Sequence, residues 1–238
     1  GTQWSYSNSG YMLLGYIIEK VTKKPYEKVV RDYIFRPLKM NNSGFDFAAL
    51  KSKHKATGYF SINGKNSTEA GIVDSSVSYA AGAIYTTTSD LLKWHKAVLN
   101  NTIIKRASTE KAFTPVKNKY GFGWGIDSIY EKRVTAHGGG IFGFNTNMAR
   151  IESDDICIVL LNNTGNPKLA DITKDIFSVL YDKPYKLPEP KKEITLPEEI
   201  LKKYAGTYEV TPQFQITITV EEGKLIAQAT DQPKFELF

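Results

Sequence analysis

The first part of the chain has a helical pattern of apolar residues. After Asn8, apolar side chains recur with the i, i+3, i+4 spacing of an amphipathic helix, at Tyr11, Leu14, Ile17, Ile18 and Val21. We expect this face to point inward, and Ser7, Asn8 or Ser9 to cap the helix N-terminus. Pro25 and Pro37 then bound a second predicted helix, at about residues 26–36.

The middle of the chain is less regular. Residues 41–82 are rich in Ser, Asn and Gly, which predicts loop with short irregular strands. The next segment, TTTSDLLKWHKAVLN, predicts another capped helix. Its cap is expected at Thr88 or Ser89, and its inward residues are expected to be Leu91, Leu92, Val98 and Leu99.

From Tyr120 onward the pattern changes to that of strands. The segments YGFGWGID, RVTAHGG, FNTNMARI and DDICIVLLN predict successive antiparallel strands joined by tight turns. A closing helix follows at about Pro167–Tyr181, with Leu169, Ile172, Ile176, Phe177 and Leu180 on one face. Helices, then a strand meander, then a helix predict an α+β fold, an antiparallel sheet with flanking helices.

Composition shifts divide the chain into three parts. Residues 1–182 form the predicted main domain, and residues 183–197, with four prolines, read as a linker. Residues 198–238 predict a short helix and a few strands, too few for a stable independent domain. Position 1 is a glycine rather than an initiator methionine, and the chain stops at FELF, within a strand pattern. We therefore expect a main domain incomplete at its N-terminus and only the start of a small β-rich C-terminal appendage.

Composition and charge narrow the function classes. The chain has 238 residues, 41% of them apolar and 24% charged, as in soluble globular proteins. The net charge is +6, but the lysines are scattered and no basic run alternates with aromatic residues, so nucleic acid is not a predicted partner. No apolar stretch approaches the ~20 residues of a membrane span. The single cysteine, Cys157, excludes an intrachain disulfide.

Metal and cofactor chemistry has no sequence support. The chain has three histidines, and none has a second ligand at metal-binding spacing. We expect His95 to pack within its helix or lie on the surface, and His54, in KSKHK, to be solvated. No phosphate-binding loop is recognisable. We therefore predict neither a metal nor a cofactor.

Two polar segments could carry chemistry: Tyr6-Ser7-Asn8 and the run from His137 to Gly140. Each has a plain structural explanation, a helix cap for the first and a glycine-rich hairpin for the second. Together they offer parts of an acyl-transfer site, namely a base, a polar amide, a histidine and backbone N–H donors. A tyrosine can act as base only where nearby cations lower its pKa. An α/β-hydrolase oxyanion loop is excluded because the chain has no G-x-S-x-G turn.

Several ordered blocks give this pattern a family resemblance: YSN-x-GY-x-LLG, AAGAIYTTTSDLLKW, YGFGWGI and HGGGIFGFNTNM followed by VLLNN. Residues 1–182 resemble the serine β-lactamase and penicillin-binding protein superfamily, in the branch of class C β-lactamases, D-Ala-D-Ala carboxypeptidases and esterases. The resemblance implies a β-lactamase/transpeptidase-like fold and three motifs, S-x-x-K, Y-x-N and K-T-G or H-x-G. It assigns Tyr6 and Asn8 to the second motif and His137, Gly138 and Gly139 to the third. It also implies that Gly140 donates its N–H to the oxyanion and that Gly138 and Gly139 bind substrate.

The first motif is not found in the expected order. The two matches to S-x-x-K, Ser52–Lys55 and Ser108–Lys111, both follow Y-x-N. The first lies in a charged loop and the second opens a predicted short surface helix, so neither is taken as the nucleophile. We expect the nucleophile to lie outside this sequence and the chain alone to be inactive.

The resemblance also limits the substrate. Class C β-lactamases usually carry lysine where this chain has His137, and histidine is not a permanent point charge. This favours a D-peptidase or esterase acting on a small-molecule, peptide or ester substrate over an efficient β-lactamase. The alternative is an inactive peptide- or cell-wall-binding relative. The resemblance further implies a periplasmic, secreted or cell-envelope location, and a truncated domain is expected to associate with itself.

Overall fold

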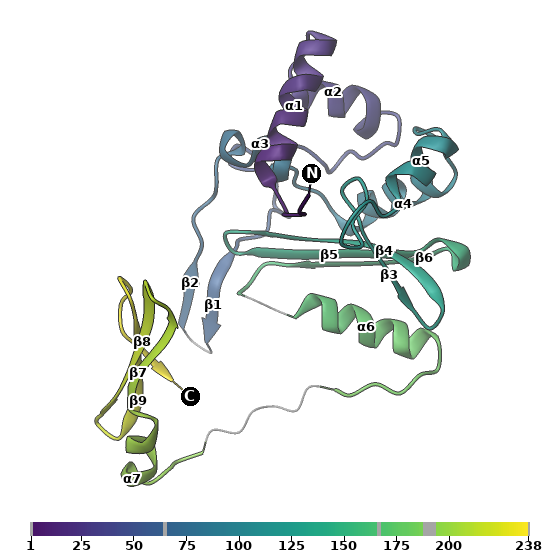
Figure 1. Cartoon of the computed structure of the whole chain (residues 1–238). Helices are drawn as coiled ribbons and strands as arrows, with labels where there is room; N and C mark the ends of the chain where they lie inside the picture. The colour runs from purple at the N-terminus through teal and green to yellow at the C-terminus, as the bar shows by residue number, and fades with distance from the viewer. Residues whose placement is uncertain (1, 64–65, 166–167, 188–193, 238) are drawn as a thin grey trace. The chain divides into compact units, whose positions relative to one another are not determined.

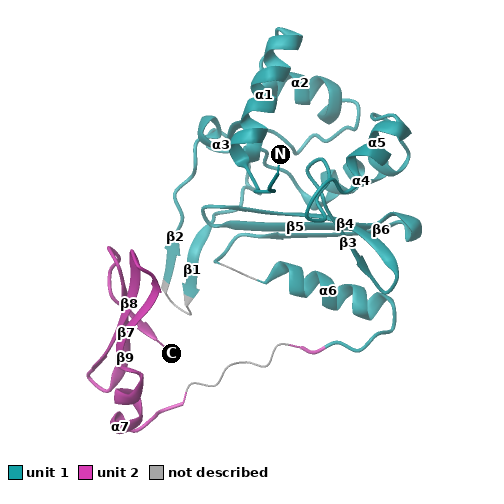
Figure 2. Cartoon of the chain, in the orientation of Figure 1, with its two compact units in different colours: residues 1–185 teal, residues 186–238 magenta. Residues whose placement is uncertain are grey.

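The computed structural model describes residues 2–63, 66–165, 168–187 and 194–237. The chain forms two compact units, residues 1–185 and 186–238, each described here by itself (Figure 2). The predicted linker, 183–197, includes residues 188–193, which lie outside the described residues.

The main sheet of the first unit is a four-stranded antiparallel meander. Its order is β3-β4-β5-β6, so each strand pairs with the next one along the chain. The strands are β3 (Gly125–Ile129), β4 (Lys132–Ile141), β5 (Phe144–Ile151) and β6 (Ile156–Asn162). The predicted antiparallel sheet is therefore confirmed. A small hairpin, β1 (Tyr59–Asn63) and β2 (Asn66–Glu69), forms a second sheet.

Helices cover both faces of this sheet (Figure 1). One face packs against α6 (Leu169–Leu180), and α4 (Thr88–Leu99) contacts β6 from the other. The remaining helices are α1 (Asn8–Thr22), α2 (Tyr26–Val30), which continues as a π-helix over Arg31–Phe35, α3 (Ser75–Gly82) and α5 (Arg106–Ala112). A 3-10 turn, Glu152–Asp154, joins β5 to β6.

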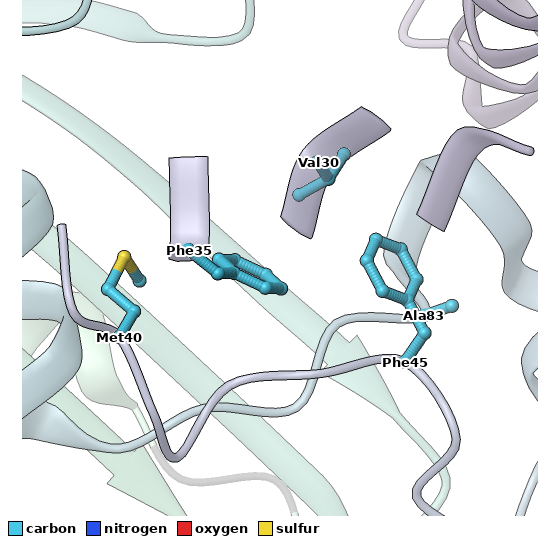
Figure 3. Close-up of a cluster of buried hydrophobic side chains, with 5 residues drawn as sticks. All are labelled: Val30, Phe35, Met40, Phe45 and Ala83. Carbon is cyan, nitrogen blue, oxygen red and sulfur yellow. The ribbon is translucent and has the colours of Figure 1, made fainter. Parts of the chain in front are cut away.

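The described residues of the first unit form three apolar clusters. One lies between the sheet and α6, where Ala149, Ile151 and Ile158 pack around Phe177. A second joins Val98 of α4 to Phe113 and Ile126. The third lies among the N-terminal helices and consists of Val30, Phe35, Met40, Phe45 and Ala83 (Figure 3).

Several predicted elements need correction. The segment YGFGWGID is strand only from Gly125, because positive φ angles at Asn118, Lys119 and Gly123 fold the preceding residues into turns. Residues 41–82 contain helix α3, which the sequence did not predict. Asp74 caps the N-terminus of this helix, because its side chain accepts the Ser76 N–H.

The helix predictions differ in smaller ways. The cap of α4 is Thr87, one residue before the predicted pair, because its Oγ1 accepts the Asp90 N–H. The predicted start of the last helix, Pro167, lies outside the described residues, and α6 begins at Leu169. Part of each predicted inward face is exposed: Leu92 in α4, Ile172 and Leu180 in α6, and Tyr11, Leu14, Ile17 and Val21 in α1.

The second unit contains a short helix and its own antiparallel sheet. The elements are α7 (Glu198–Leu201), a 3-10 turn (Lys202–Tyr204), β7 (Gly206–Thr211), β8 (Phe214–Glu221), β9 (Lys224–Ala229) and β10 (Phe235–Leu237). The strand order is β10-β9-β8-β7, and Leu201, Ala227 and Ala229 are buried. Within the described ranges of both units, no helix is long and apolar enough to cross a bilayer.

Candidate active site

The Y-x-N segment lies at the entrance to α1. Ser7 caps the helix, its Oγ accepting the Gly10 N–H at 3.1 Å, as predicted. This cap places Tyr6 just before the helix, with 49% of the residue exposed. Asn8 is the first helical residue and is also exposed. Both side chains therefore face solvent at the start of α1.

The H-x-G segment lies on an open edge of the main sheet. Pairing of β3 with β4 ends at Gly125 and Ala136. Pairing of β4 with β5 continues through His137 as far as Ile141 and Phe144. In the described part of the chain, no strand pairs with β4 on the side away from β5 beyond Ala136.

The ladder geometry gives the direction of the glycine peptide groups. The Ile126 N–H donates to the Lys119 carbonyl at 2.7 Å, so the peptide groups of Ile126 point away from β4. The N–H and C=O groups of the preceding residue, Gly125, therefore point toward β4, where they meet those of Ala136. Because peptide groups alternate between the two sides of a strand, those of Gly138 and Gly140 point toward the open edge. The edge therefore presents the N–H of Gly140, the group predicted to bind an oxyanion.

The fold brings the two segments together. The rings of Tyr6 and His137 have centroids 6.1 Å apart. Tyr120 completes a triangle, with its ring 6.2 Å from that of Tyr6 and 6.0 Å from that of His137. Trp4 packs on the outer side of Tyr120 at 5.6 Å. Residues separated by more than a hundred positions thus form one aromatic cluster beside the open edge of β4.

Both ring nitrogens of His137 have hydrogen-bond partners. Nε2 lies 2.7 Å from the hydroxyl oxygen of Tyr120. Nδ1 lies 2.6 Å from the carbonyl oxygen of Gly138, on the same strand. The imidazole is therefore fixed both to its own backbone and to a neighbouring phenol.

Burial raises the pKa of two tyrosines at this cluster. Burial, together with charge on Tyr11 and Tyr6, raises the pKa of Tyr120 to about 12. Burial also raises the pKa of Tyr11, again helped by Tyr6. Both phenols therefore stay protonated at neutral pH. Among the described residues, no cation–π contact includes the Tyr6 ring.

The two local S-x-x-K matches do not join this cluster. Ser52 and Ser108 are exposed, the latter on α5. Lys55, the lysine of the first match, donates from Nζ to the Ala48 carbonyl at 3.0 Å and lies over the Phe47 ring. The contacts of its ammonium are thus with Ala48 and Phe47, not with the Ser52 hydroxyl.

The other histidines have structural or solvent positions. His95 is buried, as its packing interpretation predicted, with Nδ1 accepting from Arg150 Nε and Nε2 beside Asp155 Oδ1. His54 is exposed. In the part of the chain that the structure describes, no group of three or more His, Cys, Asp or Glu residues is placed to hold a metal ion.

Sequence reasoning missed Trp4, Tyr11 and Tyr120. The available signal was YGFGWG, a motif quoted for family resemblance and interpreted only as a strand. Its glycines permit close approach, because a Cβ on Gly121 would meet the Ala112 carbonyl oxygen at 2.2 Å. A Cβ on Gly123 would lie 3.1 Å from the Tyr11 hydroxyl. Such glycines indicate a segment pressed against its neighbours, and this packing orients Tyr120.

The arrangement agrees with comparisons to known proteins. A family model described as Beta-lactamase matches residues 1–180. The chain belongs to this family. Residues 190–238 match a second model, a domain of unknown function called DUF3471. The family consists of serine hydrolases of the β-lactamase fold and includes penicillin-binding protein homologues.

Individual relatives give the same result. The chain is 30% identical to penicillin-binding protein 4* of Bacillus subtilis over 99% of this chain and 57% of that protein. It is 31% identical to the putative penicillin-binding protein PbpX of the same organism, over 74% of this chain and 44% of the relative. The chain therefore spans about half the length of these relatives.

Solved structures share the fold. The octameric penicillin-binding protein homologue from Pyrococcus abyssi aligns with a TM-score of 0.67 and 25% identity, covering 99% of this chain and 55% of that one. A D-amino acid amidase from Ochrobactrum anthropi aligns with a TM-score of 0.63 and 24% identity, over 76% of this chain and 59% of the other. The second likeness, at this identity, concerns the fold alone.

Proposed function

We propose that the chain supplies the second and third catalytic motifs of a serine acyl hydrolase that works through an acyl-enzyme. The observation that carries this is the meeting of Tyr6 with His137 beside an open strand edge. The S-x-x-K nucleophile and its lysine come from a part of the parent protein outside this sequence. The isolated chain is then inactive.

The proposed steps follow from the positions of the groups. The serine hydroxyl attacks the carbonyl carbon of an amide, lactam or ester, while its one proton moves away by way of Tyr6 and the external lysine. Negative charge develops on the carbonyl oxygen and is stabilised by the Gly140 N–H. The proton then passes to the leaving amine or alcohol, and water later releases the acyl group. Asn8 holds the substrate amide.

The open edge of β4 suits an extended substrate. A peptide-like backbone can pair with the outward groups of Gly138 and Gly140 as an added strand. The absence of side chains at these glycines lets a second backbone approach closely. Together with histidine at position 137, this favours a D-peptide, amide or ester over a β-lactam as the natural substrate.

Acylation by a labelled penicillin tests the proposal. This chain and a version extended toward the N-terminus are each treated with the probe, and intact masses are measured. We expect a stoichiometric adduct on the extended protein, none on this chain and a strongly slowed reaction in extended Tyr6→Phe. An adduct on this chain contradicts its inactivity, and no adduct on either removes penicillin recognition from the proposal.

Amide and ester substrates distinguish the enzyme from a binding module. The extended protein is assayed with D-phenylalanine amide and p-nitrophenyl acetate, with extended Ser52→Ala and Ser108→Ala as matched controls. Turnover that survives both substitutions supports an external nucleophile. Binding of cell-wall peptide without any turnover would favour the inactive relative.

Two further proposals concern association and location, and the exposed apolar residues of α1 support the first. We propose that this chain self-associates through Leu14, Ile17 and Val21, which are exposed despite their helical spacing. Sedimentation should show association that Leu14→Lys weakens, whereas a monomer at high concentration would contradict it. The bacterial cell envelope is the proposed location of the parent, in keeping with its penicillin-binding relatives. Fractionation of cells producing the parent protein tests this.

A further inference from the structure

The hydrogen bonds of His137 determine which nitrogen carries its proton. The Gly138 carbonyl oxygen, 2.6 Å from Nδ1, can only accept, so Nδ1 is the protonated nitrogen. In the neutral ring, Nε2 then has a lone pair and no hydrogen. The Tyr120 hydroxyl, 2.7 Å away, must therefore be the donor of the second bond.

Tyr120 is itself firmly held. It ends a tight turn in which its N–H donates to the Lys117 carbonyl at 2.9 Å, and its own carbonyl accepts the Val116 N–H at 2.9 Å. The two central residues of the turn, Asn118 and Lys119, both have positive φ, as in the mirror-image turns of hairpins. Its ring is then held between Trp4 and Tyr6.

We propose that Tyr120 is the positioning residue that sets the tautomer and ring orientation of His137 in the active site. This inference rests on the proposed function, since it concerns the same site. The Tyr120 hydroxyl keeps Nε2 as an acceptor and holds the imidazole against the ring of Tyr6. When Nε2 gains a proton, it becomes the donor of this hydrogen bond. The Tyr120 hydroxyl, until then the donor, must rotate so that its oxygen accepts the bond.

The electrostatics of Tyr120 suit a donor that remains in place. Burial, together with charge on Tyr11 and Tyr6, raises its pKa to about 12, so the phenol keeps its proton at neutral pH. Tyr11 provides a comparison within the same cluster. Its hydroxyl faces the backbone at Gly123, and its pKa is also raised by burial. In the part of the chain that the structure describes, the hydrogen bonds of the His137 ring go to Tyr120 and Gly138, not to Tyr11.

Nitrogen NMR on this chain tests the proposal without any activity. The chain has only three histidines, so the ring signals of His137 can be assigned with the variant His137→Gln. At about pH 9, where imidazole is neutral, we expect the Nδ1–H tautomer with Nε2 hydrogen-bonded. Tyr120→Phe should shift Nε2 toward the value of a free acceptor, and Tyr11→Phe should leave it unchanged.

Two results would overturn the proposal. One is an Nε2–H tautomer in the unmodified chain, which requires no variant to fold. The other is a Tyr120→Phe spectrum in which the His137 nitrogens do not move. Because these readouts need no nucleophile, they stand or fall separately from the penicillin adduct that tests the proposed function.

Kinetics in the extended protein distinguish positioning from packing. Tyr120→Phe keeps the ring and its contacts and removes only the donor. We expect kcat to fall by about 10- to 100-fold, as for other orienting hydrogen bonds, with KM nearly unchanged. Equal kcat in the two proteins would refute the assigned role. A loss confined to KM would do the same, since it would indicate substrate contact instead.

Discussion

The two faces of the β3–β6 sheet are built from the same strands but have different chemistry. Toward α6, the strands present apolar residues, including Ala149 and Ile151, which pack around Phe177. Toward α4, the residue between them, Arg150, is fully buried as a cation, and His137 lies at the open end of β4. Period-two alternation alone separates these faces.

The difference between the two faces agrees with the position of the candidate site. Apolar burial has no preferred direction, so one helix suffices to close the α6 face. Buried polar groups need specific partners, and on the α4 side these are found one by one, as in the bond from Arg150 Nε to His95 Nδ1 at 2.8 Å. The face that already fixes polar side chains is the one that can hold catalytic groups in position.

The largest expected effect is on the apolar face. Phe177 is 1% exposed, and Phe177→Ala should lower the free energy of unfolding by about 3–5 kcal/mol through lost burial and a cavity. The matched control, Val179→Ala on the same helix, is exposed and should cost less than about 0.5 kcal/mol. Urea unfolding followed by tryptophan fluorescence measures both, because Trp4, Trp94 and Trp124 all lie in the first unit. Equal costs would mean that α6 does not close this face.

The second prediction concerns the buried cation on the other face. The Arg150 guanidinium lies over the rings of Phe113 and Trp124, at 5.3 and 5.7 Å. Burial lowers its pKa. Among the described residues, its two terminal nitrogens have no hydrogen-bond partner. Arg150→Ala should therefore cost about 3 kcal/mol for the cavity.

The volume-preserving variant separates charge from packing. Arg150→Met fills most of the same space and removes a charge that is costly to bury, so we expect a cost of about 1 kcal/mol or less. Both variants are measured by the same urea titration. A cost for Met as large as that for Ala would mean that the cation itself stabilises this face.

The comparison of helices α1 and α6 shows how far the sequence could predict the fold. Both have apolar residues at helical spacing, and both helices form. The spacing identifies which side is apolar but not what covers it. Phe177 is buried, whereas Val21 is 77% exposed. Local rules predicted the strands, the Ser7 cap and the meander because these depend on neighbours in sequence.

The sequence predicted residues of the candidate site only where they belong to a recognisable family motif. Tyr6 and His137 were paired by family resemblance, and the structure brings their rings to 6.1 Å. Tyr120 stands in the YGFGWG motif, but the motif did not predict its contact with His137, since that contact depends on a turn with two positive φ angles and on packing with Trp4. Such nonlocal contacts are not encoded in periodicity.

The third prediction is a pH dependence from the polar face. Burial lowers the pKa of His95, and Arg150 and Lys96 lower it too, while the hydrogen bond and charge of Asp155 oppose them. A depressed folded pKa means that the unfolded state binds the proton first as the pH falls below about 6.5. The contribution of His95 to stability should therefore be constant above that pH and decrease below it.

A histidine variant isolates this contribution. His95→Asn keeps an acceptor for Arg150 Nε but does not titrate, so its stability should decrease less between about pH 6.5 and 5 than that of the unmodified chain. Urea midpoints at several pH values provide the measurement. Identical slopes would show that His95 takes up its proton equally in the folded and unfolded states.

The smallest effect concerns the glycines of β4. A Cβ atom added at successive positions of this strand would point to opposite faces of the sheet. A Cβ on Gly138 would meet no atom closer than 3.6 Å, so Gly138→Ala should stabilise by about 0.5 kcal/mol through the unfolded state. A Cβ on Gly139 would lie 2.6 Å from Thr146 Oγ1 and force that side chain to rotate, so Gly139→Ala should cost about 0.5 kcal/mol.

A double-mutant cycle decides whether the Thr146 contact is the cause. In a Thr146→Ala background the hydroxyl is gone, and Gly139→Ala should become neutral or slightly stabilising, like Gly138→Ala. Urea midpoints of the four proteins measure the coupling. If Gly139→Ala costs the same in both backgrounds, the crowding comes from the strand backbone. Position 139 would then require glycine for the ladder itself, independently of the face to which its Cβ would point.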